Sequence, residues 1–262
     1  MLLGVDHLVI AVRDPDAAAA MMEADLGLAV TGGGRHEHAG TFNRLAFLGD
    51  TYLELIGVFD RSLAESSTAF AVARASMAVL DEGREGLAAW AVATDDAEAE
   101  VERLRAAGSP IGDVAAGSRT RPDGEVVRWV TAFPVIGPER PPFLIEHEAA
   151  GAEWGAEARA ARAVFRHPVG GAVRLRSITI PVAEVRAVAT RYRDEVGIDV
   201  GPDGSAALGD QVVRLTPPGS PLPTVELTGE PGTAVLDVVR FGIRWMRSAG
   251  SERRPATDTA IR

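Results

Sequence analysis

Residues 4–27, GVDHLVIAVRDPDAAAAMMEADLG, contain the pattern that decides the fold. The opening positions are mostly apolar and rich in Val and Ile, which predicts a strand. Asp14 is a suitable helix N-cap, Pro15 suits the first helical position, and Gly27 suits a helix end. The stretch therefore predicts a strand that is followed directly by a helix.

The same pattern occurs twice more along the chain. GLAAWAVAT (86–94) precedes DDAEAEVERLRAAG (95–108), and LRSITIPV (175–182) precedes AEVRAVATRYRDEVG (183–197). The acid at the helix start and the glycine at its end are 13 positions apart in all three copies, counted from Asp14, Asp95 and Glu184. Equal intervals of this kind indicate internal repeats.

Short strand-like runs follow each helix, and the last run of each copy carries a glutamate: Glu54, Glu146 and Glu226. The repeated unit is therefore expected to be βαβββ, at residues 4–58, 85–149 and 172–230. This predicts an α+β fold built from tandem modules. The stretch GTAVLDVVRFGIRW (232–245) fits a helix or a strand, and we favour a strand that begins a truncated fourth unit.

We expect a domain of two modules at residues 1–150, a helical linker at 151–171, a third module at 172–246 and a disordered tail at 247–262. The third module fits the βαβββ plan less closely than the first two.

Composition excludes several classes of function. The formal net charge of -10 argues against nucleic-acid binding. The chain has no cysteine, so any metal ligands must be nitrogen or oxygen atoms, and it has no lysine, so Schiff-base and P-loop mechanisms are excluded. We see neither a signal peptide nor an apolar run of about 18 residues, and expect a cytoplasmic protein without membrane contact.

One acidic and one basic side chain each interrupt a predicted apolar strand. Glu54 in YLELI shares a strand face with Tyr52 and Ile56, so it is either a solvated charge or an inward functional group. His7 lies in the apolar run VDHLVIAV, where a lone histidine is more often a satisfied core side chain than a ligand. The residues alone leave both alternatives open.

Four segments carry a family resemblance: GVDHLVIAVRDPDAA, GGRHEHAGTFNRLAFLGDTYLELIGV, GSRTRPDGEVVRWVTAFP and PFLIEHE. Together they resemble the vicinal oxygen chelate superfamily and, within it, the glyoxalase-like domain family of bacterial proteins, over about residues 4–150. The resemblance implies that two modules pair into an eight-stranded cup. It also implies metal ligands on the first and last strand of each module.

Mapped onto this chain, those ligand positions are His7, Glu54, Ala88 and Glu146. Ala88 cannot bind a metal, so the implied site consists of His7, Glu54 and Glu146, with Mn, Fe, Zn, Ni or Mg as the divalent ion. Glu54 or Glu146 would act as the general base of an isomerase, epimerase or lyase. His147 points to the opposite strand face from Glu146 and is not expected to be a ligand.

Substrate contacts are expected from His36, Thr41, Asn43 and Arg128. His36 follows a glycine run, and Thr41 and Asn43 share one strand face. Arg128, if it points into the cup, would bind a carboxylate or phosphate through two hydrogen bonds. The alternative reading is a metal-free binding protein that holds a small molecule or sequesters an antibiotic. Because the number of modules is odd, we expect a homodimer.

Overall fold

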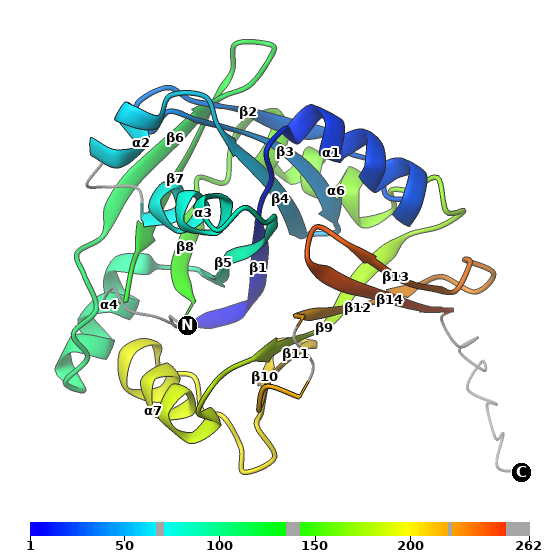
Figure 1. Ribbon diagram of the computed structural model, residues 1–262. Coiled ribbons are helices and arrows are strands. Elements are labelled where there is room, and N and C mark those ends of the chain that lie inside the picture. The colour runs from blue at the N-terminus through cyan, green and yellow to red at the C-terminus, as the bar shows by residue number, and fades with distance from the viewer. Residues whose placement is uncertain (67–70, 135–141, 220–221, 250–262) are drawn as a thin grey trace, which may run out of the picture.

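The computed structural model describes residues 1–66, 71–134, 142–219 and 222–249, and Figure 1 shows the arrangement of its elements. The first repeat comprises β1 (Leu2–Ala11), α1 (Pro15–Met21), the π-helical turn η1 (Met22–Leu26), β2 (Gly32–His36), β3 (Thr41–Leu48) and β4 (Thr51–Val58). Helices α2 (Arg61–Ser66) and α3 (Ala71–Asp81) lead to the second repeat, which comprises β5 (Gly86–Thr94), α4 (Ala97–Ala106), β6 (Ala115–Thr120), β7 (Val126–Ala132) and β8 (Phe143–His147).

The rest of the chain begins with the short helices α5 (Gly151–Trp154) and α6 (Ala156–Ala163). It continues with β9 (Val173–Pro181), α7 (Val185–Val196), β10 (Ser205–Leu208), β11 (Gln211–Thr216), β12 (Thr224–Gly229), β13 (Leu236–Arg240) and β14 (Ile243–Ala249). No helix in the described ranges is long and apolar enough to cross a membrane.

The first two repeats form a closed barrel with the strand order β1-β4-β3-β2-β6-β7-β8-β5. β1 is parallel to β4 within its own repeat and antiparallel to β5, so the two repeats join along their first strands. The predicted eight-stranded cup of two βαβββ modules is therefore confirmed.

The helix ends follow the sequence pattern with one shift. Asp14 accepts hydrogen bonds from the backbone N–H groups of Asp16 and Ala17, and Gly27 ends the helical segment at a positive φ of 66°. In the second repeat the N-cap is Asp96, whereas Asp95 pairs with the chain's N-terminal amine. Counting from Asp96 moves the position equivalent to His7 from Ala88 to Ala89, which is equally unable to bind a metal.

A second sheet has the order β10-β11-β9-β12-β14-β13. β11 is parallel to β9 as β4 is to β1, and β12 is antiparallel to β9 as β5 is to β1. The third module thus lacks one strand and ends at β11. The βαβββ unit expected at residues 172–230 therefore stops one strand short. β12 begins the truncated fourth unit, and residues 232–245 supply its later strands.

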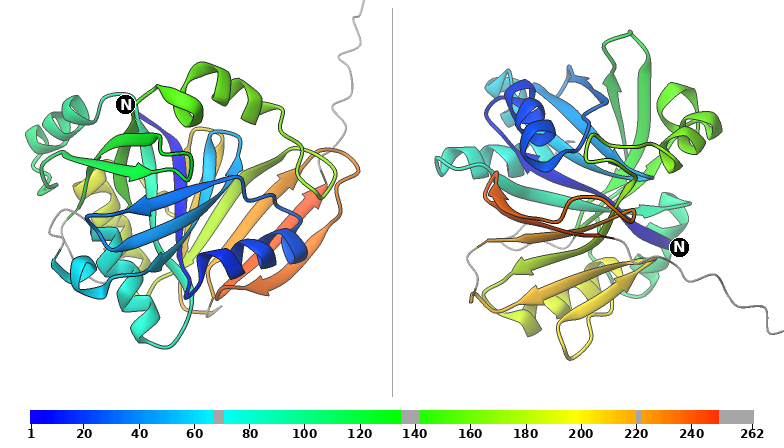
Figure 2. Two further views of the ribbon diagram at one scale, coloured as in Figure 1. Left: turned by 90° about the horizontal axis from the view of Figure 1, so that it is seen from above. Right: turned by 90° about the vertical axis from the view of Figure 1, so that its right-hand side faces the viewer.

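The second sheet packs against the outside of the barrel, as the right-hand view of Figure 2 shows. Leu8, Leu53 and Trp90 of the barrel belong to the same buried apolar cluster as Ile178 and Trp245 of the second sheet. The hydrophobic effect that drives this contact scales with the apolar surface area removed from water. The additional strands therefore cover the outer barrel face and leave the cup interior to the first two repeats.

Candidate functional site

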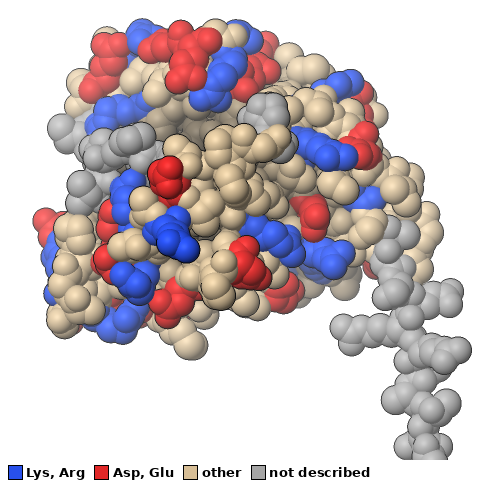
Figure 3. Space-filling view, turned by 60° about the horizontal axis from the view of Figure 1, so that its bottom comes forward, with Lys and Arg blue, Asp and Glu red and all other residues tan. Residues whose placement is uncertain are grey.

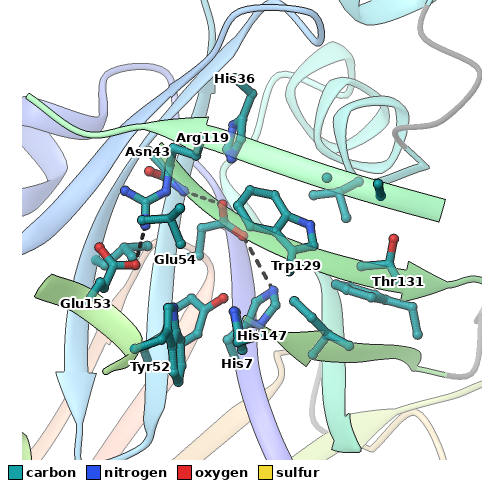
Figure 4. A pocket seen from close by; sticks show the side chains of 18 of the residues that line it. His7, His36, Asn43, Tyr52, Glu54, Arg119, Trp129, Thr131, His147 and Glu153 are labelled. Atoms are coloured by element: carbon teal, nitrogen blue, oxygen red, sulfur yellow. Dashed lines mark hydrogen bonds and ion pairs between the residues drawn. The ribbon is translucent and has the colours of Figure 1, made fainter. Parts of the chain in front are cut away.

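A cavity lies inside the barrel, and Figure 4 shows the side chains around it. The volume of this cavity is about 40 Å³. Its lining combines ionisable and aromatic groups with small apolar ones: His7, His36, Asn43, Leu45, Tyr52, Glu54, Val72, Ala116, Gly117, Arg119, Val127, Trp129, Thr131, Phe133, Phe143, Ile145, His147, Glu153 and Trp154.

Glu54 faces this cavity together with Tyr52, while Leu53 and Leu55 on the same strand face the apolar core. Alternation along β4 therefore selects the inward alternative for Glu54. Glu54 is 6% exposed, and its Oε1 accepts a hydrogen bond of 2.6 Å from Asn43 Nδ2. Asn43 is itself oriented, because its Oδ1 accepts from the backbone N–H of Gly34 at 2.9 Å.

His7 is held by its neighbour Asp6, which sequence reasoning missed. The β1 register is irregular between Val5 and His7, and both Asp6 and His7 are buried there. Asp6 Oδ1 lies 2.6 Å from His7 Nδ1 and 3.1 Å from His147 Nε2, so one carboxylate holds two imidazole rings. The signal in the sequence was a charged residue in an otherwise apolar strand.

The electrostatics of Asp6 favour its ionised form. Burial alone would raise the pKa of Asp6, but the electrostatic interaction and hydrogen bonds with His147 and His7 outweigh burial and hold the pKa well below its usual range. On the other side of the His7 ring, Nε2 lies 3.6 Å from Glu54 Oε2. Asp6, His7 and Glu54 therefore form a line of alternating acid and base across the cavity wall.

The last strand of the second repeat presents His147, not Glu146, to the cavity. Phe143, Ile145 and His147 of β8 line it, as the period of two along a strand requires. Glu146 points away, and its Oε2 accepts a 2.8 Å hydrogen bond from the backbone N–H of Ala97 at the start of α4. The predicted placement of Glu146 beside His7 and Glu54 is therefore wrong. His147 lies on the opposite strand face from Glu146, as expected, and that face is the one that lines the cavity.

The donor set does not fit the metal centre that the family resemblance implies. Among the described residues, no group of three or more His, Asp or Glu side chains is arranged to hold an ion. His7 and Glu54 meet, but Glu146 caps α4, and Ala88 and Ala89 carry no ligand atom. Catalytic metal sites usually take three protein ligands, and this geometry offers two.

The cation of the site is Arg119, not Arg128. Arg128 is exposed on β7, because it lies on the strand face opposite Val127 and Trp129, which both line the cavity. Arg119 on β6 is 3% exposed, lines the cavity and pairs through Nη2 with Glu153 of α5. Its Nη1 is buried and has no hydrogen-bond partner in the described part of the chain.

His36 and Tyr52 are buried in their neutral forms. Burial lowers the pKa of His36 from 6.5 to about 3, and the charge of Arg119 acts in the same direction. Burial likewise raises the pKa of Tyr52 well above 10, with the charges of Asp6 and Glu54 adding to the effect. Thr41 does not line the cavity, and it hydrogen-bonds the His36 ring at Nδ1 over 2.9 Å.

Aromatic rings complete the wall. The His147 ring stacks on Trp154 at 3.7 Å, and His7 stacks on Tyr52 at 4.5 Å, between ring centroids. Trp129 meets His36 edge to face at 5.8 Å. The cavity thus combines one buried cation, a held carboxylate and fixed imidazoles with flat apolar surfaces, which is the composition of a site for a small organic anion.

Comparison with known proteins agrees with the fold. A crystal structure of a hypothetical protein from Staphylococcus aureus matches with a TM-score of 0.77 at 17% identity, covering 95% of this chain and 100% of that one. A methylmalonyl-CoA epimerase variant from Streptomyces coelicolor, in complex with 2-nitronate-propionyl-CoA, matches with a TM-score of 0.41 at 22% identity, covering 55% and 97%. A 4-hydroxymandelate synthase mutant from the same organism gives 0.48 at 14%, covering 88% and 71%.

No curated protein matches the chain. The profile of the family described as "Glyoxalase-like domain" matches residues 5–196, which is more than half of the chain and includes the whole barrel from Val5 onward. The protein therefore belongs to the glyoxalase-like domain family.

Proposed function

We propose that this protein is an acid–base enzyme, an isomerase, epimerase or lyase, that moves a proton on a small, anionic, oxygenated substrate. The observation that carries the proposal is a buried arginine with an unused hydrogen-bond donor on the same cavity as the Glu54–His7 pair.

Arg119 would bind the anionic group of the substrate. A buried guanidinium is costly unless it is paired, and Glu153 satisfies one side of it while Nη1 remains without a partner. A charge-assisted hydrogen bond from such a donor contributes about 1.5–3 kcal/mol. A substrate carboxylate would satisfy Nη1 and place the adjacent carbon atoms inside the cavity.

Glu54 would take the proton from a carbon next to a carbonyl group. Asn43 holds Oε1, which leaves Oε2 directed toward the cavity and His7. When the C–H bond breaks, its electron pair moves to the carbonyl oxygen, and the guanidinium of Arg119 stabilises the resulting enolate. Asp6 would stabilise the imidazolium of His7 if the proton passes on to His7 Nε2, as a carboxylate does for histidine in hydrolase triads.

Carbon deprotonation has a direct test that needs no knowledge of the pathway. A panel of small 2-oxo and 2-hydroxy carboxylates is incubated with the protein in D₂O. Exchange is followed by proton NMR at the carbon next to the ketone of the 2-oxo acids and at the hydroxyl-bearing carbon, next to the carboxylate, of the 2-hydroxy acids. We expect exchange with the wild type, loss of at least 100-fold with Glu54→Gln and weakened binding with Arg119→Gln. Binding without exchange across the panel would contradict the enzymatic proposal.

Metal dependence is tested separately, because the two-ligand donor set does not support it. Purified protein is supplemented with Mn, Zn or Ni, dialysed, and analysed for metal together with His7→Ala. We expect less than stoichiometric metal in both proteins. A stoichiometric ion that is lost in His7→Ala would instead support the metal-dependent enzyme that the family resemblance implies.

A second candidate function is ligand binding without turnover. It is favoured by the stacked aromatic walls at Trp154 and Tyr52, which suit a flat ligand, and by the incomplete metal donor set. This candidate predicts tight binding of an aromatic anion that depends on Arg119 and is indifferent to Glu54→Gln.

A further inference from the structure

A second and larger cavity lies outside the barrel, between α3, the first half of β5 and the second sheet. We call it the outer cavity. Its volume is about 630 Å³, compared with about 40 Å³ for the barrel cavity. The barrel cavity has room for a small polar head group, whereas the outer cavity has room for a much larger ligand body.

The walls of the outer cavity are mainly apolar and come from both halves of the molecule. Small side chains create the space on α3 and β5: Ala71, Ala75, Ala78, Ala88 and Ala89. The second sheet, its loops and α7 contribute larger ones: Ile180, Pro181, Val182, Tyr192, Leu222 and Pro223. Figure 3 looks onto this side of the molecule and shows a hollow with uncharged walls below a rim of charged side chains.

The two cavities share part of one wall. Val72, Phe133 and Phe143 line both of them. The Phe143 ring lies 5.4 Å from the His7 ring on the barrel side and stacks on Phe133 at 4.8 Å, measured between centroids. The separation between the proposed proton-transfer pair and the outer cavity is therefore about one aromatic ring.

A buried polar atom distinguishes the outer cavity from a simple packing defect. Trp90 lines it and is 3% exposed, and its indole Nε1 has no hydrogen-bond partner among the described residues. A buried indole N–H normally finds an acceptor, since leaving it unsatisfied is unfavourable. A bound molecule with an oxygen atom in this cavity would supply that acceptor.

We propose that the outer cavity is a subsite for the apolar body of the same substrate whose anionic group binds Arg119. The substrate class is then an amphipathic carboxylate, with its head beside Glu54 and His7 and its apolar body beyond Phe143. This inference rests on the proposed function for the head group, but the outer cavity is defined by separate residues.

Straight-chain carboxylates of four, eight and twelve carbons test the proposal, with the alcohols of the same lengths as neutral probes. Binding to the full-length chain is measured by calorimetry below the concentrations at which the probes aggregate. We expect wild-type affinity to rise by about fourfold per added methylene until the cavity is filled. Ala78→Trp and Ala88→Trp, from two different walls, should remove this increase and leave the four-carbon acid unchanged.

Ala160→Trp is the matched control, because Ala160 is exposed on α6 away from the outer cavity. Affinity that is independent of chain length in the wild type, or an increase that survives in both folded tryptophan variants, would overturn the proposal. Arg119→Gln separates the two claims: it should weaken the acids at least tenfold and leave the alcohols unchanged. Arg119→Gln could leave the affinities for both acids and alcohols unchanged while the tryptophan variants still remove the rise of affinity with chain length. The subsite would then stand, and the anion-binding role of Arg119 would fail.

Discussion

At the scale of single residues, the chemistry depends on which ionisable groups are buried together. Asp6 hydrogen-bonds both His7 and His147, and its lowered pKa keeps it ionised to a lower pH than an ordinary aspartate. The pair of imidazoles therefore shares one negative charge inside the barrel. This arrangement fixes the direction of the His7 ring and leaves its Nε2 facing Glu54.

His36 predicts a specific dependence of stability on pH. Its pKa is about 3 in the folded chain and 6.5 in the reference state, so below pH 6.5 the unfolded chain binds a proton that the folded chain does not. The free energy of unfolding should therefore fall as the pH is lowered from 6.5 toward 3, by up to about 1.4 kcal/mol per pH unit for this one group. Urea unfolding of His36→Gln over this range should give a smaller slope than the wild type.

His38→Gln is the matched control, because His38 is exposed two positions further along the chain. Its slope should stay close to that of the wild type, because burial and Arg119 contribute more than His38 to the lowered pKa of His36. Buried carboxylates such as Asp6 contribute in the same direction, but only as the pH falls below about 3.8. An unchanged slope in His36→Gln between pH 6.5 and 4 would mean that His36 is not kept neutral by the fold.

Sequence patterns identified part of the site for a clear physical reason. Alternation along one strand placed Glu54 correctly once one face was known to be inward, and His36 and Asn43 lie on the cavity as expected. Glu146 and Arg128 were placed wrongly, since each lies on the outer face of its strand. A one-residue error in strand phase exchanges the two faces, and family resemblance did not fix that phase.

At the scale of secondary-structure elements, contacts between distant strands position the reactive residues. Gln211 on β11 accepts a 2.7 Å hydrogen bond from the backbone N–H of Val5 and donates one of 2.7 Å to Thr51 Oγ1. Thr51 in turn donates to the Val5 carbonyl oxygen at 3.0 Å. These bonds anchor β1 immediately before the shift of its pairing register at Asp6. No local pattern predicts them, because Gln211 and Val5 are 206 positions apart.

Glu146 is expected to stabilise a helix and to take no part in the reaction. Its carboxylate accepts from the Ala97 N–H at the start of α4, where a negative charge is also favourable for the helix dipole. Glu146→Ala should therefore lower the free energy of unfolding by about 1 kcal/mol, measured in urea. Carboxylate binding and any deuterium exchange should remain at the wild-type level, in contrast to Glu54→Gln.

The neighbouring exposed Glu148 supplies a matched control, since Glu148→Ala removes the same charge without a helix contact. It should change stability by less than 0.5 kcal/mol, as expected for an exposed site. Loss of exchange in Glu146→Ala with an unchanged fold would restore Glu146 to the catalytic group and contradict the geometry described here.

At the scale of the whole molecule, the repeated units are joined by one apolar core. Leu8 and Leu55 of the barrel belong to the same cluster as Leu175, Val225 and Leu227 of the second sheet. The repeat pattern predicted a third unit, and this unit covers the outer barrel face together with the strands that follow it. The pattern did not predict the missing strand, because β12 is similar in local sequence to a final strand and only its antiparallel pairing with β9 reveals its role.

A shared core should make the two sheets unfold together. Leu227 is 1% exposed on β12, and Leu227→Ala should lower the free energy of unfolding by about 2–5 kcal/mol. Hydrogen exchange followed by mass spectrometry in moderate urea measures this loss separately in peptides from β4 and from β12. We expect the same loss in both, although Leu227 lies outside the barrel. Val239→Ala on β13, where Val239 is 48% exposed, should change neither peptide appreciably. A loss confined to β12 would mean that the second sheet opens as an independent unit, and the outer cavity between the two sheets would then lack a fixed wall.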